Sequence, residues 1–198
     1  MIARLVPGAM LVAVLSSAAG FPDLTIPAQD DPVRKIVFFA VFAAAAYSAG
    51  LTVSALSWIL SALGWFVVYP ILKYAGSVDT LTSAFTRHSL QAPPLAWANP
   101  LVAMDVFARA HDHIKAHAHE ERGVVMKLAA EVTLLYSLTI AFLVVGVCMK
   151  WPARYFVVPL ALFTGGIIRS VRTWQRHATI LLANPTRPLS AQPEVQKL

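Results

Sequence analysis

The chain has few charged residues and a single cysteine, and both shortages restrict what it can be. Only 13% of its 198 residues are Asp, Glu, Lys or Arg, whereas soluble globular chains average about 25%. Cys148 alone cannot form an intramolecular disulfide framework or a CxxC metal knuckle. The sequence also lacks a GxSxG nucleophile motif, a Walker loop and an HExxH metalloprotease motif. No enzyme class is indicated, and a non-enzymatic role is favoured.

Charge is absent altogether from residues 36–72, between Lys35 and Lys73. One membrane crossing needs roughly 20 apolar residues, so this stretch is too long for a single simple crossing and too apolar for a soluble core helix. Hydrophobic residues make up 58% of the chain. We therefore predict an all-α polytopic membrane protein.

Two architectures compete for the stretch from Val33 to Gly76. A hairpin would turn near residues 48–50, whereas a single crossing from about Arg34 to Leu56 would continue as an apolar helix to about residue 75. Unpaired peptide groups are costly in hydrocarbon, so a turn must lie near a surface. Residues 49–54 contain no charge, Pro, Asn or Asp. We therefore predict one long or kinked second helix over residues 34–75.

The remaining apolar stretches bring the expected total to four transmembrane helices. Residues 4–21 resemble a signal peptide, but Arg4 is their only basic residue and Pro7 interrupts the apolar run, so we expect a retained first helix. The domain prediction is residues 1–76 for the first two transmembrane helices, 77–122 for a small cytosolic helical segment, 123–183 for a transmembrane hairpin with a basic cytosolic extension, and 184–198 for a disordered tail.

The distribution of basic residues is compatible with this topology but does not select it. With four crossings and both termini cytoplasmic, 12 of the 16 Lys and Arg residues lie inside. The exceptions are Arg34, Lys35, Lys150 and Arg154. Five crossings with the N-terminus outside place 13 inside and 3 outside, so the positive-inside rule does not choose between them.

A histidine cluster within residues 109–121 is the most visible candidate site. His113, His117 and Glu121 are spaced by fours, which on a helix places three potential zinc ligands on one face. A solvated, His-rich helix end is the alternative, and we favour it. Zinc is therefore a possible cofactor only, and no other cofactor is expected. The cluster could also gain charge near pH 6.

Charged residues near the membrane provide two further candidates. Glu131 lies within an apolar run, where an ionisable side chain usually faces protein or water rather than lipid. We predict that it pairs with Arg169, with pairing to Lys127 and a pore-lining position as alternatives. Arg169, Arg172 and Arg176 share one helix face and predict contact with anionic lipid or an acidic partner. Nucleic acid is possible but is not indicated.

The segments RLVPGAML, at residues 4–11, and FAAAAYSAGL, at residues 42–51, resemble small uncharacterised multi-pass bacterial membrane proteins. Some of these resemble accessories or effectors of antiviral defence loci of the CRISPR type. The resemblance implies a homo-oligomeric protein of the bacterial inner membrane that acts as a pore-like effector or an accessory. A degenerate RNase motif in some accessories separates Arg and His by four to six residues, and no histidine after Arg109 has that spacing. The alternatives are a structural or assembly subunit of a larger complex and a His-dependent metal-binding membrane protein.

Overall fold

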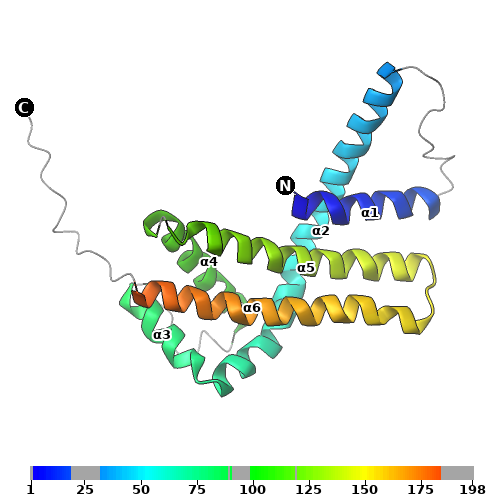
Figure 1. Ribbon diagram of the computed structural model, residues 1–198. Helices are drawn as coiled ribbons and strands as arrows, with labels where there is room; N and C mark the ends of the chain where they lie inside the picture. Colours follow the sequence, from blue (N-terminus) through cyan, green and yellow to red (C-terminus); the bar gives the residue numbers. More distant parts are fainter. Residues whose placement is uncertain (1, 19–31, 89, 91–98, 119, 184–198) are drawn as a thin grey trace, which may run out of the picture. The chain divides into compact units, whose positions relative to one another are not determined.

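The computed structural model describes residues 2–18, 32–88, 90, 99–118 and 120–183, and within these ranges all regular structure is helical (Figure 1). The helices are α1 (Ile2–Ala18), α2 (Pro32–Tyr74), α3 (Ser77–Arg87), α4 (Pro100–His117), α5 (Arg122–Cys148), the 3-10 helix η2 (Ala153–Phe156) and α6 (Val157–Ala183). The all-α prediction is confirmed for this part of the chain. The predicted disordered tail lies outside the described residues.

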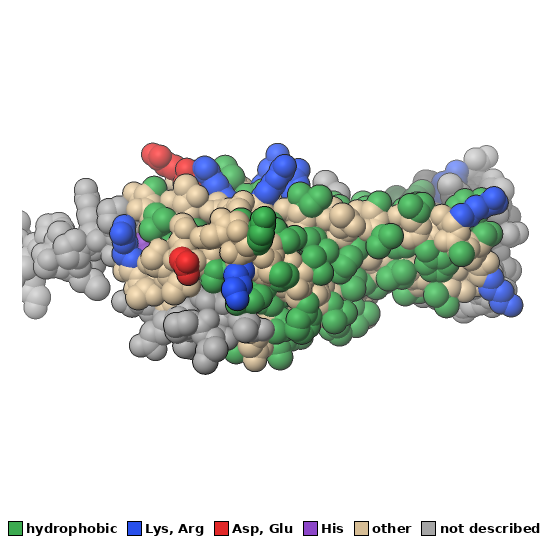
Figure 2. Space-filling view, turned by 90° about the horizontal axis from the view of Figure 1, so that it is seen from below, with side chains coloured by type: hydrophobic (Ala, Val, Ile, Leu, Met, Phe, Trp, Pro, Cys, Tyr) green, Lys and Arg blue, Asp and Glu red, His purple; other side chains and the backbone are tan. Residues whose placement is uncertain are grey.

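Among the described residues, three helices are long and apolar enough to cross a membrane, which confirms the prediction of a membrane protein with transmembrane helices. They cover Lys35–Tyr74, Arg122–Cys148 and Ala153–Ala183. Figure 2 shows hydrophobic side chains spread over much of the visible surface. The 17 residues of α1 make it about 25 Å long, short of the ~30 Å hydrocarbon core. A fourth crossing therefore stays a prediction.

The long second helix is confirmed, and the hairpin alternative is wrong. α2 runs without interruption for 43 residues, and Thr52 donates its hydroxyl to the carbonyl of Ser48 one turn earlier, across the site where a hairpin would turn. Residues 49–54 contain no charge, Pro, Asn or Asp that would favour a turn in place of the helix, so the helix continues. Pro70 lies inside α2 close to its end. The chain then reverses at Gly76, whose positive φ of 66° suits glycine.

The described chain divides into two compact units. Unit 1 comprises Met1–Val68 and Met126–Val171, and unit 2 comprises Tyr69–Val125 and Arg172–Leu198. The two units share three helices, because the divisions fall within α2, α5 and α6.

Unit 1 packs through very close helix contacts. A Cβ on Gly8 of α1 would collide with the carbonyl oxygen of Ala46 and would lie 2.6 Å from the amide nitrogen of Gly50, both on α2. Beside this crossing, Leu11 packs with Val53 and Ala141. Small residues let helix backbones approach closely in membranes. The small residues Gly8, Ala46 and Gly50 thus allow α1 and α2 to approach closely.

Tyr136 of α5 forms the second close contact of unit 1. A Cβ on Gly64 of α2 would lie 2.7 Å from the Tyr136 hydroxyl, and a Cβ on Gly166 of α6 would lie 2.7 Å from the ring carbon Cε1. The tyrosine is 1% exposed. Its large ring therefore fills space that two glycines leave open.

Unit 2 is built from amphipathic helices. α3 buries Leu81, Ala84 and Phe85, and α4 buries Ala103, Val106, Ala110 and Ile114, at the spacing of three and four that one helix face requires. Pro100 occupies the first turn of α4, and the side chain of Asn99 accepts a hydrogen bond from the amide of Leu101 as an N-cap. In the described residues, α3 and α4 account for the helical segment that was predicted at residues 77–122.

Candidate functional site

The predicted intramembrane ion pair forms within unit 1. The Nε atom of Arg169 on α6 lies 3.3 Å from Oε2 of Glu131 on α5. This oxygen is buried and accepts no hydrogen bond, so the contact is a charge–charge interaction without good hydrogen-bond alignment. The hydroxyl groups of Tyr136 and Ser170 form a hydrogen bond of 3.2 Å between the same two helices. The pairing favours a structural role for Glu131, because a neighbouring positive charge compensates the carboxylate.

The predicted arginine face is largely engaged within the protein. Arg169 pairs with Glu131, and Arg176 donates a 2.9 Å hydrogen bond to Oε2 of Glu121. Arg172 is exposed. Two of the three guanidinium groups thus compensate carboxylates of the chain itself, which reduces the charge available to lipid. Contact with lipid or an acidic partner stays a prediction.

The zinc alternative for His113, His117 and Glu121, which the sequence did not favour, finds no support among the described residues. α4 ends at His117, and Ala118 leaves the helical conformation with φ −109° and ψ 74°. Glu121 is therefore out of helical register with the two histidines, and its carboxylate pairs with Arg176. Among the described residues no group of three or more His, Cys, Asp or Glu side chains could hold a metal ion.

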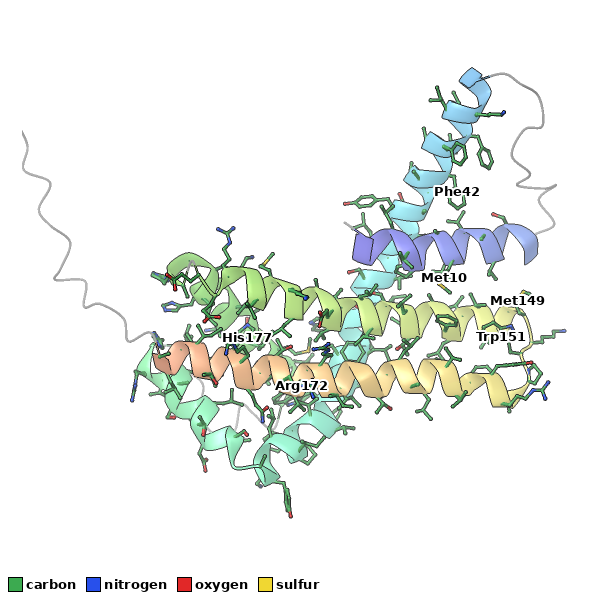
Figure 3. The ribbon with its side chains drawn as sticks, viewed as in Figure 1. Met10, Phe42, Met149, Trp151, Arg172 and His177 are labelled. Atoms are coloured by element: carbon green, nitrogen blue, oxygen red, sulfur yellow. The ribbon has the colours of Figure 1, made fainter. Side chains whose placement is uncertain are left out.

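The histidines instead form contacts in unit 2 that sequence reasoning missed. His177 of α6 extends toward α4 (Figure 3), where its Nε2 lies 3.2 Å from Nδ1 of His111. The other nitrogen of His177, Nδ1, donates to the carbonyl of Thr173 at 2.7 Å. Because Nδ1 carries the proton, Nε2 is the acceptor, and His111 must donate to it through Nδ1–H. Two neutral imidazoles therefore join α4 to α6.

Aromatic rings enclose this histidine pair. Phe107 of α4 lies 4.5 Å from the rings of both Trp174 and His177, measured between centroids. His177 is fully buried. Burial lowers the pKa of His111, and Lys115 lowers it further, whereas Asp112 opposes both effects. The neutral form of the pair is therefore favoured by its surroundings.

His88, at the end of α3, begins a second histidine contact. Its Nε2 donates to the carbonyl of Leu181 at 2.6 Å, while Nδ1 is buried without a hydrogen-bond partner. Its ring lies 5.0 Å from that of His113, which stacks on His117 at 4.3 Å. Burial lowers the pKa of His113, as do His117 and His88. The helical sequence spacing of the His-rich segment could not reveal these contacts, because their partners come from α3 and α6.

Comparison with known proteins gives no match to a family model, a curated protein or a solved structure.

Proposed function

We propose that this chain is a homo-oligomeric, non-enzymatic accessory component of a membrane, and that its copies associate through α2. The observation that carries this proposal is the length of the exposed apolar surface on α2. Exposed hydrophobic side chains continue from Ile36 to Tyr74, a distance of about 57 Å at about 1.5 Å per residue. The most apolar part of the helix is only 17% buried within the chain.

The hydrocarbon core alone does not account for this length. The hydrocarbon core is about 30 Å thick, and a helix tilted by about 40°, the upper end of the usual range, has about 39 Å within it. About 18 Å of apolar helix, roughly a dozen residues, then extends beyond the hydrocarbon. Protein is the natural cover for such a surface, and a second copy of the chain is the commonest partner.

Cross-linking tests the proposed association directly. In a Cys148→Ser background, single cysteines at Ile59 and Phe66 of α2 are expected to form intermolecular disulfides in native membranes. Val53→Cys controls for burial on the same helix, and Leu160→Cys controls for an equally apolar, exposed position on α6. A strictly monomeric protein in detergent and in nanodiscs, with no cross-link from α2, would contradict the proposal.

A pore-like effector is the second candidate, and Glu131 is the observation in its favour. A carboxylate within an apolar helix usually faces protein or water, and in unit 1 it faces Arg169. Conductance of proteoliposomes separates the candidates. A change in ion flux in the Glu131→Gln variant, at normal expression, supports the pore. Loss of expression in that variant supports a structural pair instead.

Stable co-purification of a different protein would favour the third possibility, a structural or assembly subunit of a larger complex. The place of the chain in antiviral defence is proposed from the resemblance alone. Two observations test this place: which genes neighbour the gene for this chain, and whether cells that carry it survive phage challenge better than cells that lack it.

The proposed location is the bacterial inner membrane, with four crossings and both termini in the cytoplasm. Thiol labelling of Ser54→Cys and Ser77→Cys in the Cys148→Ser background tests this topology. Ser77 is the first residue of the segment that we place in the cytosol, so its cysteine is expected to react only from that side. Labelling of that position from outside would contradict four crossings.

A further inference from the structure

The hydrogen bond between His111 and His177 is sensitive to the number of protons that the two rings carry. In the neutral pair, Nδ1–H of His177 donates to Thr173 and Nε2 accepts from His111. Nε2 of His111 is the remaining nitrogen, and the first added proton goes there. The bond survives this step and becomes charge-assisted.

A second proton has a different effect. It can bind only at Nε2 of His177, the atom that accepts the hydrogen bond from His111. Two N–H groups would then face each other over the present 3.2 Å, and two positive rings would repel one another. The second charge would also lie on a fully buried side chain, where desolvation disfavours it.

We propose that the His111–His177 pair is an acid-operated latch of unit 2, which holds α4 against α6 at neutral pH and releases α4 when both rings are protonated. Release separates Phe107 from Trp174 and His177, because these rings pack across the same contact. The latch is independent of α2 association, so a monomeric protein would leave it intact.

The charged groups around the pair mostly oppose its protonation. On α4, Lys115 repels added charge at His111, and Asp112 attracts it. On α6, Arg176 is adjacent to His177 in the sequence and is compensated by Glu121. His88 of α3 and His113 of α4 form the second contact. The latch therefore opens below the ordinary titration range of histidine rather than within it.

Hydrogen–deuterium exchange of the full chain in detergent tests the latch. Peptides from α4 are compared at pH 7.5 and pH 5.0 after correction for intrinsic exchange rates. Opening linked to proton uptake increases α4 exchange about tenfold per pH unit for each proton bound. Peptides from residues 126–148 of α5, in unit 1, are expected to keep their protection. Unchanged α4 exchange in the wild type, or an equal increase in α5, overturns the proposal.

Substitutions assign the effect to the pair. His177→Phe keeps an aromatic ring in the enclosure but cannot be protonated, so α4 is expected to stay protected at pH 5.0. His117→Asn removes an exposed histidine at the end of α4 and is expected to retain the acid response. If H177F does not fold, His111→Asn removes the same proton link and must also abolish the response. An acid response equal to that of the wild type in the folded variant overturns the latch.

Discussion

The two units hold their helices together by different physical means. In unit 1, glycines admit a neighbouring backbone or the ring of Tyr136 at distances that a Cβ would prevent. In unit 2, imidazole hydrogen bonds and aromatic rings connect α4 and α3 to the last part of α6. Contacts between apolar surfaces of matched shape do not depend on protonation, whereas hydrogen bonds between imidazoles do. The same chain thus combines a permanent type of helix contact with a conditional one.

The largest expected effect comes from adding a side chain at the α1–α2 crossing. In Gly8→Val, the new Cβ meets backbone atoms of Ala46 and Gly50, which cannot move aside as a flexible side chain can. We expect the free energy of unfolding to fall by about 3 kcal/mol or more, at the upper end of overpacking costs, or the variant to fail to fold. Thermal unfolding in detergent measures it. Gly123→Ala is the control, because nothing lies within 4 Å of its Cβ, and a similar loss there would contradict the argument.

The ion pair of unit 1 is the next contact to break. Glu131→Gln leaves Arg169 without its carboxylate, and we expect a destabilisation of about 1–2 kcal/mol. This is below the 3–5 kcal/mol typical of deeply buried pairs, because the two side chains are 29% and 41% exposed. The double substitution with Arg169→Met should recover part of the loss. Glu121→Gln, which breaks the more exposed pair of unit 2, should cost at most about 1 kcal/mol.

Acid should destabilise unit 2 through His111 and His113. Burial lowers the folded-state pKa of both below the ordinary value of 6.5, so the unfolded chain binds more protons than the folded one under acid conditions. Their contribution to stability is therefore complete above pH 6.5 and is lost as the pH falls through the folded-state pKa values. The midpoint of thermal unfolding should fall on the order of 2–4 °C between pH 7.5 and pH 5.5. The double variant His111→Asn/His113→Asn should show a smaller fall, and an equal one would contradict this assignment.

The smallest effect should come from removing a hydrogen bond while the shape stays the same. Tyr136→Phe loses the 3.2 Å contact with Ser170 but still fills the space at Gly64 and Gly166. We expect the free energy of unfolding to fall by about 0.5–1.5 kcal/mol. Tyr136→Ala should cost about 3–5 kcal/mol, as large-to-small core substitutions do. Similar losses in the two variants would mean that the hydrogen bond, rather than the shape of the ring, stabilises this contact.

The sequence was sufficient for the helices because local rules determine them. The absence of charge, Pro, Asn and Asp near residue 50 predicted the continuous α2, and a lone charge in an apolar run predicted the partnership of Glu131 with Arg169. Each inference needed only the local sequence and the cost of an isolated charge in an apolar environment. The pair between α5 and α6 was accessible because a short turn places these helices side by side.

The histidine contacts could not be predicted in the same way. The spacing of His113, His117 and Glu121 assumes a helix that continues to residue 121, but α4 ends at His117. The partner of His111 lies 66 positions later, and no local pattern links the two. In the sequence, His177 is one residue of a helix rich in arginine, and nothing in its neighbours indicates a contact with α4. Only tertiary packing brings its ring beside α4.

The uncharged length of α2 has a consequence for biosynthesis. A membrane insertase orients a segment largely by the basic residues beside it, and here these are Arg34 and Lys35 before a 37-residue uncharged stretch and Lys73 after it. The difference is a single positive charge. The segment therefore carries a weak orientation signal of its own, and the basic residues that flank later helices must help to fix its direction during insertion.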